Sequence, residues 1–156
     1  MVNNKKVLFI CNKGGHYSQM LQLKELMCKC NSFVVSDKKN GAKDWEGVAK
    51  YRCIDAYNIK KIRLPYFVKN IFECLGILIK FKPKYIVTTG AGLAIPMFLV
   101  GKLLRIKLVF IESRARVYSK SSSGRLLGKL SDHTIVQWAE MLKVYGPNAK
   151  YYGTIV

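Results

Sequence analysis

Short runs of apolar and β-branched residues alternate along the chain with longer stretches whose apolar residues recur at helical spacing. Runs of the first kind are typical of buried strands, and stretches of the second kind are typical of amphipathic helices. The expected strands are residues 6–11, 32–36, 51–54, 85–89, 107–111, 133–137 and 150–152. The expected helices are residues 16–29, 66–81, 92–104, 122–130 and 139–145, and the polar stretch 37–50 is expected to be a loop.

This order of elements predicts the fold class. Strands that alternate with helices form βαβ units and a parallel sheet. Continuous apolar runs indicate strands that are buried on both faces of that sheet. The prediction is therefore an α/β fold, a single Rossmann-like doubly wound parallel sheet of six or seven strands. The chain of 156 residues has the size of one domain, so residues 1–156 are interpreted as one.

Four distinctive turns each follow an expected strand. In open parallel sheets, ligands bind beyond the carboxyl ends of the strands. Because those ends share one edge, we expect the four turns to form a site there. The turns are residues 12–16, 89–92, 112–116 and 137–138.

The first turn contains Gly14, Gly15 and His16. Two glycines let the backbone approach a ligand closely and leave helix N–H groups free for an anion. The turn has neither the G-x-G-x-x-G dinucleotide fingerprint nor a P-loop lysine. His16 is a candidate general base, because imidazole ionises near neutral pH. The alternative is a tight strand-to-helix turn with a capping histidine.

The second turn, Gly90, Ala91 and Gly92, could cradle a phosphate or could simply let a helix pack closely on a strand. The third turn places Glu112 at the end of an apolar strand, where a carboxylate is costly unless it is paired or used. The nearby Arg116 could clamp a pyrophosphate. The alternative is an internal Glu–Arg pair that fixes the loop.

The charge balance limits the classes of partner that this protein is expected to bind. The chain has 27 Lys and Arg against 9 Asp and Glu, a net charge of +18, which attracts nucleic acid, anionic membranes or phosphorylated substrates. The helix at 66–81 combines large apolar side chains with lysines. Such a helix could lie on a membrane surface, or its apolar side could simply face the protein core.

The longest apolar stretch, 93–111, is interrupted by three basic residues, so neither a membrane-spanning helix nor a signal peptide is expected. The five cysteines lack zinc-site spacing and are expected to be reduced thiols of a cytosolic protein, without a metal site.

Taken in order, a collinear series of motifs resembles a known family. The chain resembles the acceptor-binding subunit of the eukaryotic dolichol-linked N-acetylglucosaminyltransferase, and more closely its bacterial capsule and exopolysaccharide counterparts, over residues 5–156. One departure is that the eukaryotic turn has Gly-Gly-His-Thr followed by Glu-Met, whereas this chain has Tyr17 and Gln19. The matching residues are Gly14-Gly15-His16 with Met20, residues 88–92 with Pro96, residues 111–113 with Arg116, Ser123-Gly124, Asp132, Gln137-Trp138 and Tyr152-Gly153.

The resemblance implies the N-terminal, acceptor-side half of a split GT-B glycosyltransferase. A separate subunit would bind the UDP-sugar, and the acceptor would be a sugar on a polyprenyl pyrophosphate. No cofactor or metal is implied. The eukaryotic members carry an N-terminal membrane anchor. No such anchor is expected in this chain, so peripheral attachment to the cytoplasmic face of an anionic membrane is expected.

The resemblance also implies roles for the candidate residues. His16 would be the general base or would orient the acceptor hydroxyl, and Glu112 would orient His16 or the acceptor sugar. Arg116 would meet the pyrophosphate. The residues expected to line the acceptor cleft are Gly14, Gly15, Gly90, Ala91, Gly92 and Gln137.

Two alternatives remain open from the sequence. A basic nucleic-acid-binding module would explain the charge, but the chain shows no RNP-like aromatic pattern, zinc finger or helix-turn-helix, and no nucleic-acid partner is expected. A non-catalytic stimulator of a partner transferase would leave His16 without a chemical role.

Overall fold

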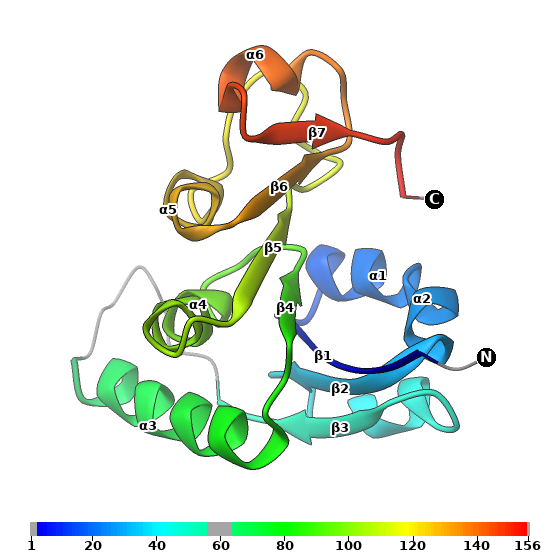
Figure 1. The fold of residues 1–156 in the computed structure, drawn as a ribbon, viewed down its shortest axis with the longest axis vertical. Coiled ribbons are helices and arrows are strands. Elements are labelled where there is room, and N and C mark those ends of the chain that lie inside the picture. The colour runs from blue at the N-terminus through cyan, green and yellow to red at the C-terminus, as the bar shows by residue number, and fades with distance from the viewer. Residues whose placement is uncertain (1–2, 56–63, 156) are drawn as a thin grey trace.

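A computed structural model describes residues 3–55 and 64–155 of the chain. Within these residues, seven parallel strands form one sheet in the order β3-β2-β1-β4-β5-β6-β7 (Figure 1). The strands are β1 (Asn3–Cys11), β2 (Cys30–Ser36), β3 (Lys50–Cys53), β4 (Tyr85–Thr88), β5 (Lys107–Ile111), β6 (His133–Val136) and β7 (Ala149–Tyr151). The helices are α1 (Gly15–Leu21), α2 (Lys24–Cys28), the 3₁₀ helix η1 (Gly41–Trp45), α3 (Leu64–Phe81), α4 (Ala94–Leu103), α5 (Gly124–Leu130) and α6 (Met141–Tyr145). The predicted Rossmann-like parallel sheet is confirmed.

The central strands are buried on both faces, as their apolar runs predict. In β1, Leu8 and Ile10 pack with side chains of α3 and α4, whereas Phe9 packs on the opposite face with side chains of α1 and α2. Figure 1 shows this division, with α3, α4 and α5 on one side of the sheet and α1 and α2 on the other. None of the helices in the described residues has both the length and the apolar character needed to cross a membrane.

The second face of the sheet is only partly covered by helices. The crossovers from β3 through β6 all proceed in one direction across the sheet, and right-handed connections in one direction place their helices on one face. As a result, Val109 and Ile135 remain partly exposed on the other face. They line an open apolar groove of about 340 Å³ together with Val87 and Ile111.

Two predictions about local structure need correction. The single helix predicted at 16–29 is two helices, because the chain turns at Leu23, whose N–H donates to the carbonyl oxygen of Met20. The predicted loop at 37–50 contains η1, which buries Trp45 completely. The Trp45 indole donates to the hydroxyl of Tyr17 at 2.8 Å, so a long-range contact orders this polar segment.

Candidate functional site

The four predicted turns meet at one edge of the sheet. The strand register pairs Ile10 with Thr88, Thr88 with Phe110, and Ile111 with Ile135. The carboxyl ends of β1, β4, β5 and β6 are therefore aligned, and each is followed by one of the turns. We call the turns after these four strands the rim.

His16 lies in the first turn of α1, after Gly14, whose φ of 92° favours glycine. The His16 ring is half-buried, and its Nδ1 atom lies 2.8 Å from the carbonyl oxygen of Thr89. The Thr89 hydroxyl in turn donates to the carbonyl oxygen of His16 at 2.8 Å. The prediction that Glu112 orients this ring is wrong, because the backbone of Thr89 does so.

The second turn is shaped to receive the His16 ring. Gly90 has a φ of 109°, and a Cβ atom there would lie 3.0 Å from the Cε1 atom of His16. Ala91 also has a positive φ, 81°, and its N–H donates to the hydroxyl of Ser123. Gly90 and Gly92 are both buried. The small residue at position 90 therefore permits close packing against the His16 ring.

Glu112 is 1% exposed, and protein groups surround its carboxylate. One oxygen accepts from the N–H of Ser113 at 2.7 Å. The other accepts from the N–H of Ser121 at 3.0 Å, from the Ser121 hydroxyl at 3.2 Å and from the Tyr145 hydroxyl at 2.5 Å. Burial, together with the bond to Glu112, raises the pKa of Tyr145 far above its usual range. The carboxylate thus joins the two ends of the loop between β5 and α5 and ties them to α6.

The predicted alternative of an internal Glu112–Arg pair is also wrong, since the partners of Glu112 are serines and a tyrosine. The side chains of Arg114 and Arg116 are exposed on the loop after β5. None of the ion pairs found within residues 3–55 and 64–155 involves either arginine. Both guanidinium groups are therefore open to solvent.

Gln137 is 1% exposed, and its amide is used inside the protein. Its Nε2 atom donates to the backbone oxygen of Glu112 and to the Oε1 atom of Gln19, both at 2.8 Å. Its Oε1 atom accepts from the N–H of Ile155 at 3.0 Å. The predicted contact between Gln137 and the substrate is therefore not the role that the structure gives this side chain. The Gln137 amide instead holds α1 and the C-terminal segment against the loop after β5.

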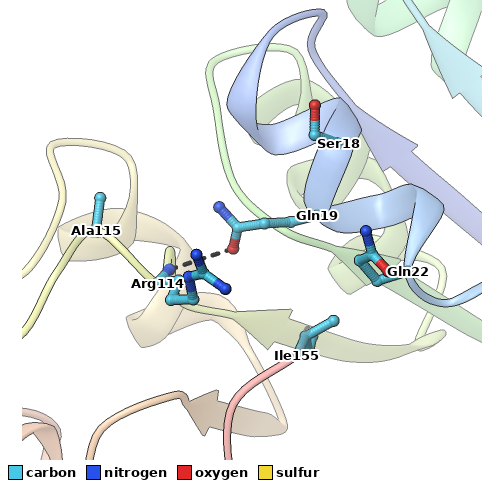
Figure 2. A pocket seen from close by; sticks show the side chains of 6 residues that line it. All are labelled: Ser18, Gln19, Gln22, Arg114, Ala115 and Ile155. Atoms are coloured by element: carbon cyan, nitrogen blue, oxygen red, sulfur yellow. Dashed lines mark hydrogen bonds between the residues drawn. The ribbon is translucent and has the colours of Figure 1, made fainter.

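Gln19 is a residue whose role the sequence left in doubt. It lies one turn after His16 on α1. Its Nε2 atom donates to the Ser113 hydroxyl, and its Oε1 atom accepts a hydrogen bond from the N–H of Arg114. Figure 2 shows it between the helix and the loop after β5, in the wall of an open pocket of about 490 Å³. The other residues that line the pocket are Ser18, Gln22, Arg114, Ala115 and Ile155. An amide at position 19 suits this place because it donates and accepts at once.

The described residues contain no group of three or more His, Cys, Asp or Glu side chains arranged to hold a metal ion. All five cysteines are unpaired thiols. Burial raises the pKa of Cys11 and of Cys74 to about 12 in each case, which keeps these two thiols protonated and inert near neutral pH.

Residues 7–155 match the family described as "Oligosaccharide biosynthesis protein Alg14 like". The chain belongs to the Alg14 family. Relatives include proteins named UDP-N-acetylglucosamine transferase subunit ALG14 from Yarrowia lipolytica, 24% identical over 99% of this chain and 82% of that protein, and from Mus musculus, 34% identical over 51% of this chain and 39% of that protein. The Kluyveromyces lactis protein of the same name is 48% identical over 32% of this chain and 21% of that protein.

Solved structures confirm the fold. MurG from Acinetobacter baumannii matches with a TM-score of 0.80 at 15% identity, over 97% of this Alg14-family chain and 46% of the MurG chain. MnaA from S. aureus, solved with UDP, matches with a TM-score of 0.77 at 14% identity, over 97% of this chain and 45% of that chain. This chain therefore spans about half the length of the solved structures that it matches.

Proposed function

We propose that this chain is the acceptor-side half of a two-subunit glycosyltransferase, and that a partner subunit binds the UDP-sugar. The observation that carries the proposal is the match of this one Rossmann-like sheet, over 97% of its length, to only 46% of the MurG chain. The relatives are named as subunits of a UDP-N-acetylglucosamine transferase, which supports a shared activity. On this proposal, sugar transfer requires both subunits.

The proposed acceptor is a sugar joined through a pyrophosphate to a polyprenyl lipid. The exposed guanidinium groups of Arg114 and Arg116 suit a pyrophosphate, because guanidinium donates two parallel hydrogen bonds to phosphate oxygens. The His16 ring, held through Nδ1, presents Nε2 as the atom that accepts a proton from the acceptor hydroxyl or orients that hydroxyl. Gly14 and Gly15, exposed beside His16, let the acceptor approach the backbone. No metal or other cofactor takes part in this proposal.

We further propose that the product belongs to a surface polysaccharide, such as capsule or exopolysaccharide, or to a lipid-linked oligosaccharide. The lipid acceptor requires the protein to work at a membrane surface. The cytoplasmic leaflet of a membrane carries a negative surface charge, and a net charge of +18 supports attachment to it. The chain would then be peripheral on the cytoplasmic face.

The test is reconstitution with a donor-binding candidate, a second Rossmann-like chain that we expect to be encoded beside this one. Each chain is purified alone and as a co-expressed pair, and transfer from radiolabelled UDP-N-acetylglucosamine to detergent-solubilised polyprenyl-pyrophosphate sugar is measured. Transfer is expected only from the pair. Robust transfer by this chain alone would disprove the split-enzyme proposal, and tight binding of UDP-sugar by this chain alone would disprove the division of substrates between the subunits.

A further inference from the structure

Helix α3 carries apolar residues on two separate faces. Its inner face, which includes Cys74, Ile77 and Leu78, is buried against the sheet and α4. A second set of apolar residues lies on the opposite side and remains exposed. This outer set is Leu64 at 66% exposure, Val68 at 41%, Phe72 at 67% and Ile79 at 54%.

The outer residues form one continuous stripe along the helix. At about 100° of rotation per residue, the four side chains fall within an arc of about 80°. We call Leu64, Val68, Phe72 and Ile79 the outer stripe. A helix that only covers a core needs one apolar stripe, and exposed apolar patches mark interaction surfaces. Helix α4, which packs beside α3 (Figure 1), also exposes Leu99 and Leu103, and Leu104 directly after the helix is exposed too.

Cationic side chains flank the outer stripe. A shallow pocket of about 440 Å³ on α3 is lined by Phe72 of the stripe, by Lys69 one turn before it and Lys80 about two turns after it, and by Arg52 of β3. Gly76 and the half-buried Glu73 complete its lining. Lys69 also forms an exposed ion pair with Asp55, whose carboxylate lies 3.9 Å away. Three cations against the two carboxylates Glu73 and Asp55 still leave this region net positive, next to an exposed aromatic ring. Cations beside an apolar ring complement a phospholipid surface, which presents anionic headgroups beside acyl chains.

The position of α3 relates this surface to the rim. The amide nitrogen of Asn70 donates to the backbone oxygen of Asp55 at 2.9 Å. Asp55 lies two residues after the end of β3, so the N-terminal half of α3 lies near the carboxyl ends of the strands, which is the edge that carries His16. A bilayer in contact with α3 would therefore lie close to the edge where a lipid-linked acceptor has to arrive.

We infer that the outer stripe of α3 and its flanking cations form a docking surface for an anionic lipid bilayer. The inference rests on the proposed lipid-linked acceptor and adds where the membrane is met. The exposed aliphatic side chains Leu64, Val68 and Ile79 distinguish this surface from one for nucleic acid, which requires cations and aromatic stacking platforms but not a stripe of aliphatic residues. Phe72 enters the acyl boundary, and Lys69, Lys80 and Arg52 meet headgroup phosphates.

The test uses the full chain without a partner or a transfer reaction, so its failure is distinct from failure of the proposed function. Flotation is measured with vesicles that contain phosphatidylglycerol and with pure phosphatidylcholine vesicles. The wild-type chain is expected to float with the anionic vesicles, and Phe72→Glu is expected to weaken partitioning by about tenfold or more. The matched control is Leu26→Glu, which makes the same charge change at a 51% exposed leucine of α2, on the other side of the sheet. This control should float like the wild type.

A second measurement reports insertion directly. Phe72→Trp places an indole in the stripe, and its fluorescence is expected to be quenched by vesicles of brominated lipid beyond the quenching seen for the wild-type Trp45 and Trp138. Equal flotation of Phe72→Glu and Leu26→Glu would overturn the inference, since charge alone would then explain binding. Absence of wild-type flotation, or absence of added quenching in Phe72→Trp, would overturn it as well.

Discussion

The Nδ1 atom of His16 lies 2.8 Å from the carbonyl oxygen of Thr89, a residue 73 positions away in the chain. Because a carbonyl oxygen only accepts, the hydrogen-bond network assigns a proton to Nδ1, and in the neutral form of the ring the lone pair lies on Nε2. The Thr89 hydroxyl donates back to the His16 backbone. The two turns thus hold the imidazole in one orientation and one tautomer, as a general base requires.

The first prediction concerns turnover. In the assembled enzyme, His16→Ala is expected to lower the transfer rate at saturating donor by about 100- to 10,000-fold, the usual loss when a general base is removed. Complex formation, measured by co-purification, should be unchanged. Near-normal turnover would place the base elsewhere and make this chain an acceptor platform or a stimulator of its partner. His16→Gln, which keeps a polar side chain without a basic nitrogen, should be almost as slow if proton transfer is the role.

The second prediction concerns the turn that receives the ring. Gly90→Ala is expected to lower the free energy of unfolding by at least about 1–2 kcal/mol, because φ is 109° there and the new methyl would crowd the His16 ring. Chemical denaturation measures the change. The control is Gly76→Ala in α3, where a Cβ meets nothing within 4 Å, and this variant should be slightly more stable than the wild type. Equal stabilities for the two variants would contradict the strain argument.

The third prediction concerns the buried carboxylate. Tyr145→Phe removes the 2.5 Å hydrogen bond to Glu112 and should cost about 1.5–3 kcal/mol of stability, as bonds to charged groups do. Tyr118→Phe removes a hydroxyl from a residue that is 79% exposed and should change stability by less than about 0.5 kcal/mol. Thermal and denaturant unfolding distinguish the two. A Tyr145→Phe protein as stable as Tyr118→Phe would mean that the Glu112 network does not depend on the hydroxyl.

The fourth prediction concerns pH. Asp132 is partly buried, which by itself raises its pKa, but the N–H of Leu108 at 2.8 Å and the ammonium of Lys102 at 3.4 Å outweigh burial and lower the pKa below its ordinary value. A lowered folded-state pKa contributes stability above the unfolded-state value of about 3.9, and this contribution is lost as the pH falls through the folded-state pKa. The wild type should therefore exceed Asp132→Asn in stability near neutral pH, and the difference should shrink below about pH 4. A pH-independent difference would contradict this account.

The sequence predicts the strands well, because the apolar runs at 6–11, 85–89 and 107–111 carry a strong local signal. It misses the break at Leu23, where neither glycine nor proline marks the end of α1. It also misses η1, since the order of that segment depends on Trp45 reaching Tyr17 across 28 positions. Local periodicity carries no information about such a contact.

The sequence by itself determined the parallel sheet and the gathering of the turns with His16, Glu112 and Gln137 at one edge, because βαβ connectivity forces the carboxyl ends of the strands together. Only the tertiary structure decided what each side chain does there. Glu112 is bonded to Tyr145, and Gln137 to Gln19, across 33 and 118 positions of the chain. Which donor reaches which acceptor depends on side-chain packing within a few ångströms, and no pattern along the chain encodes those distances.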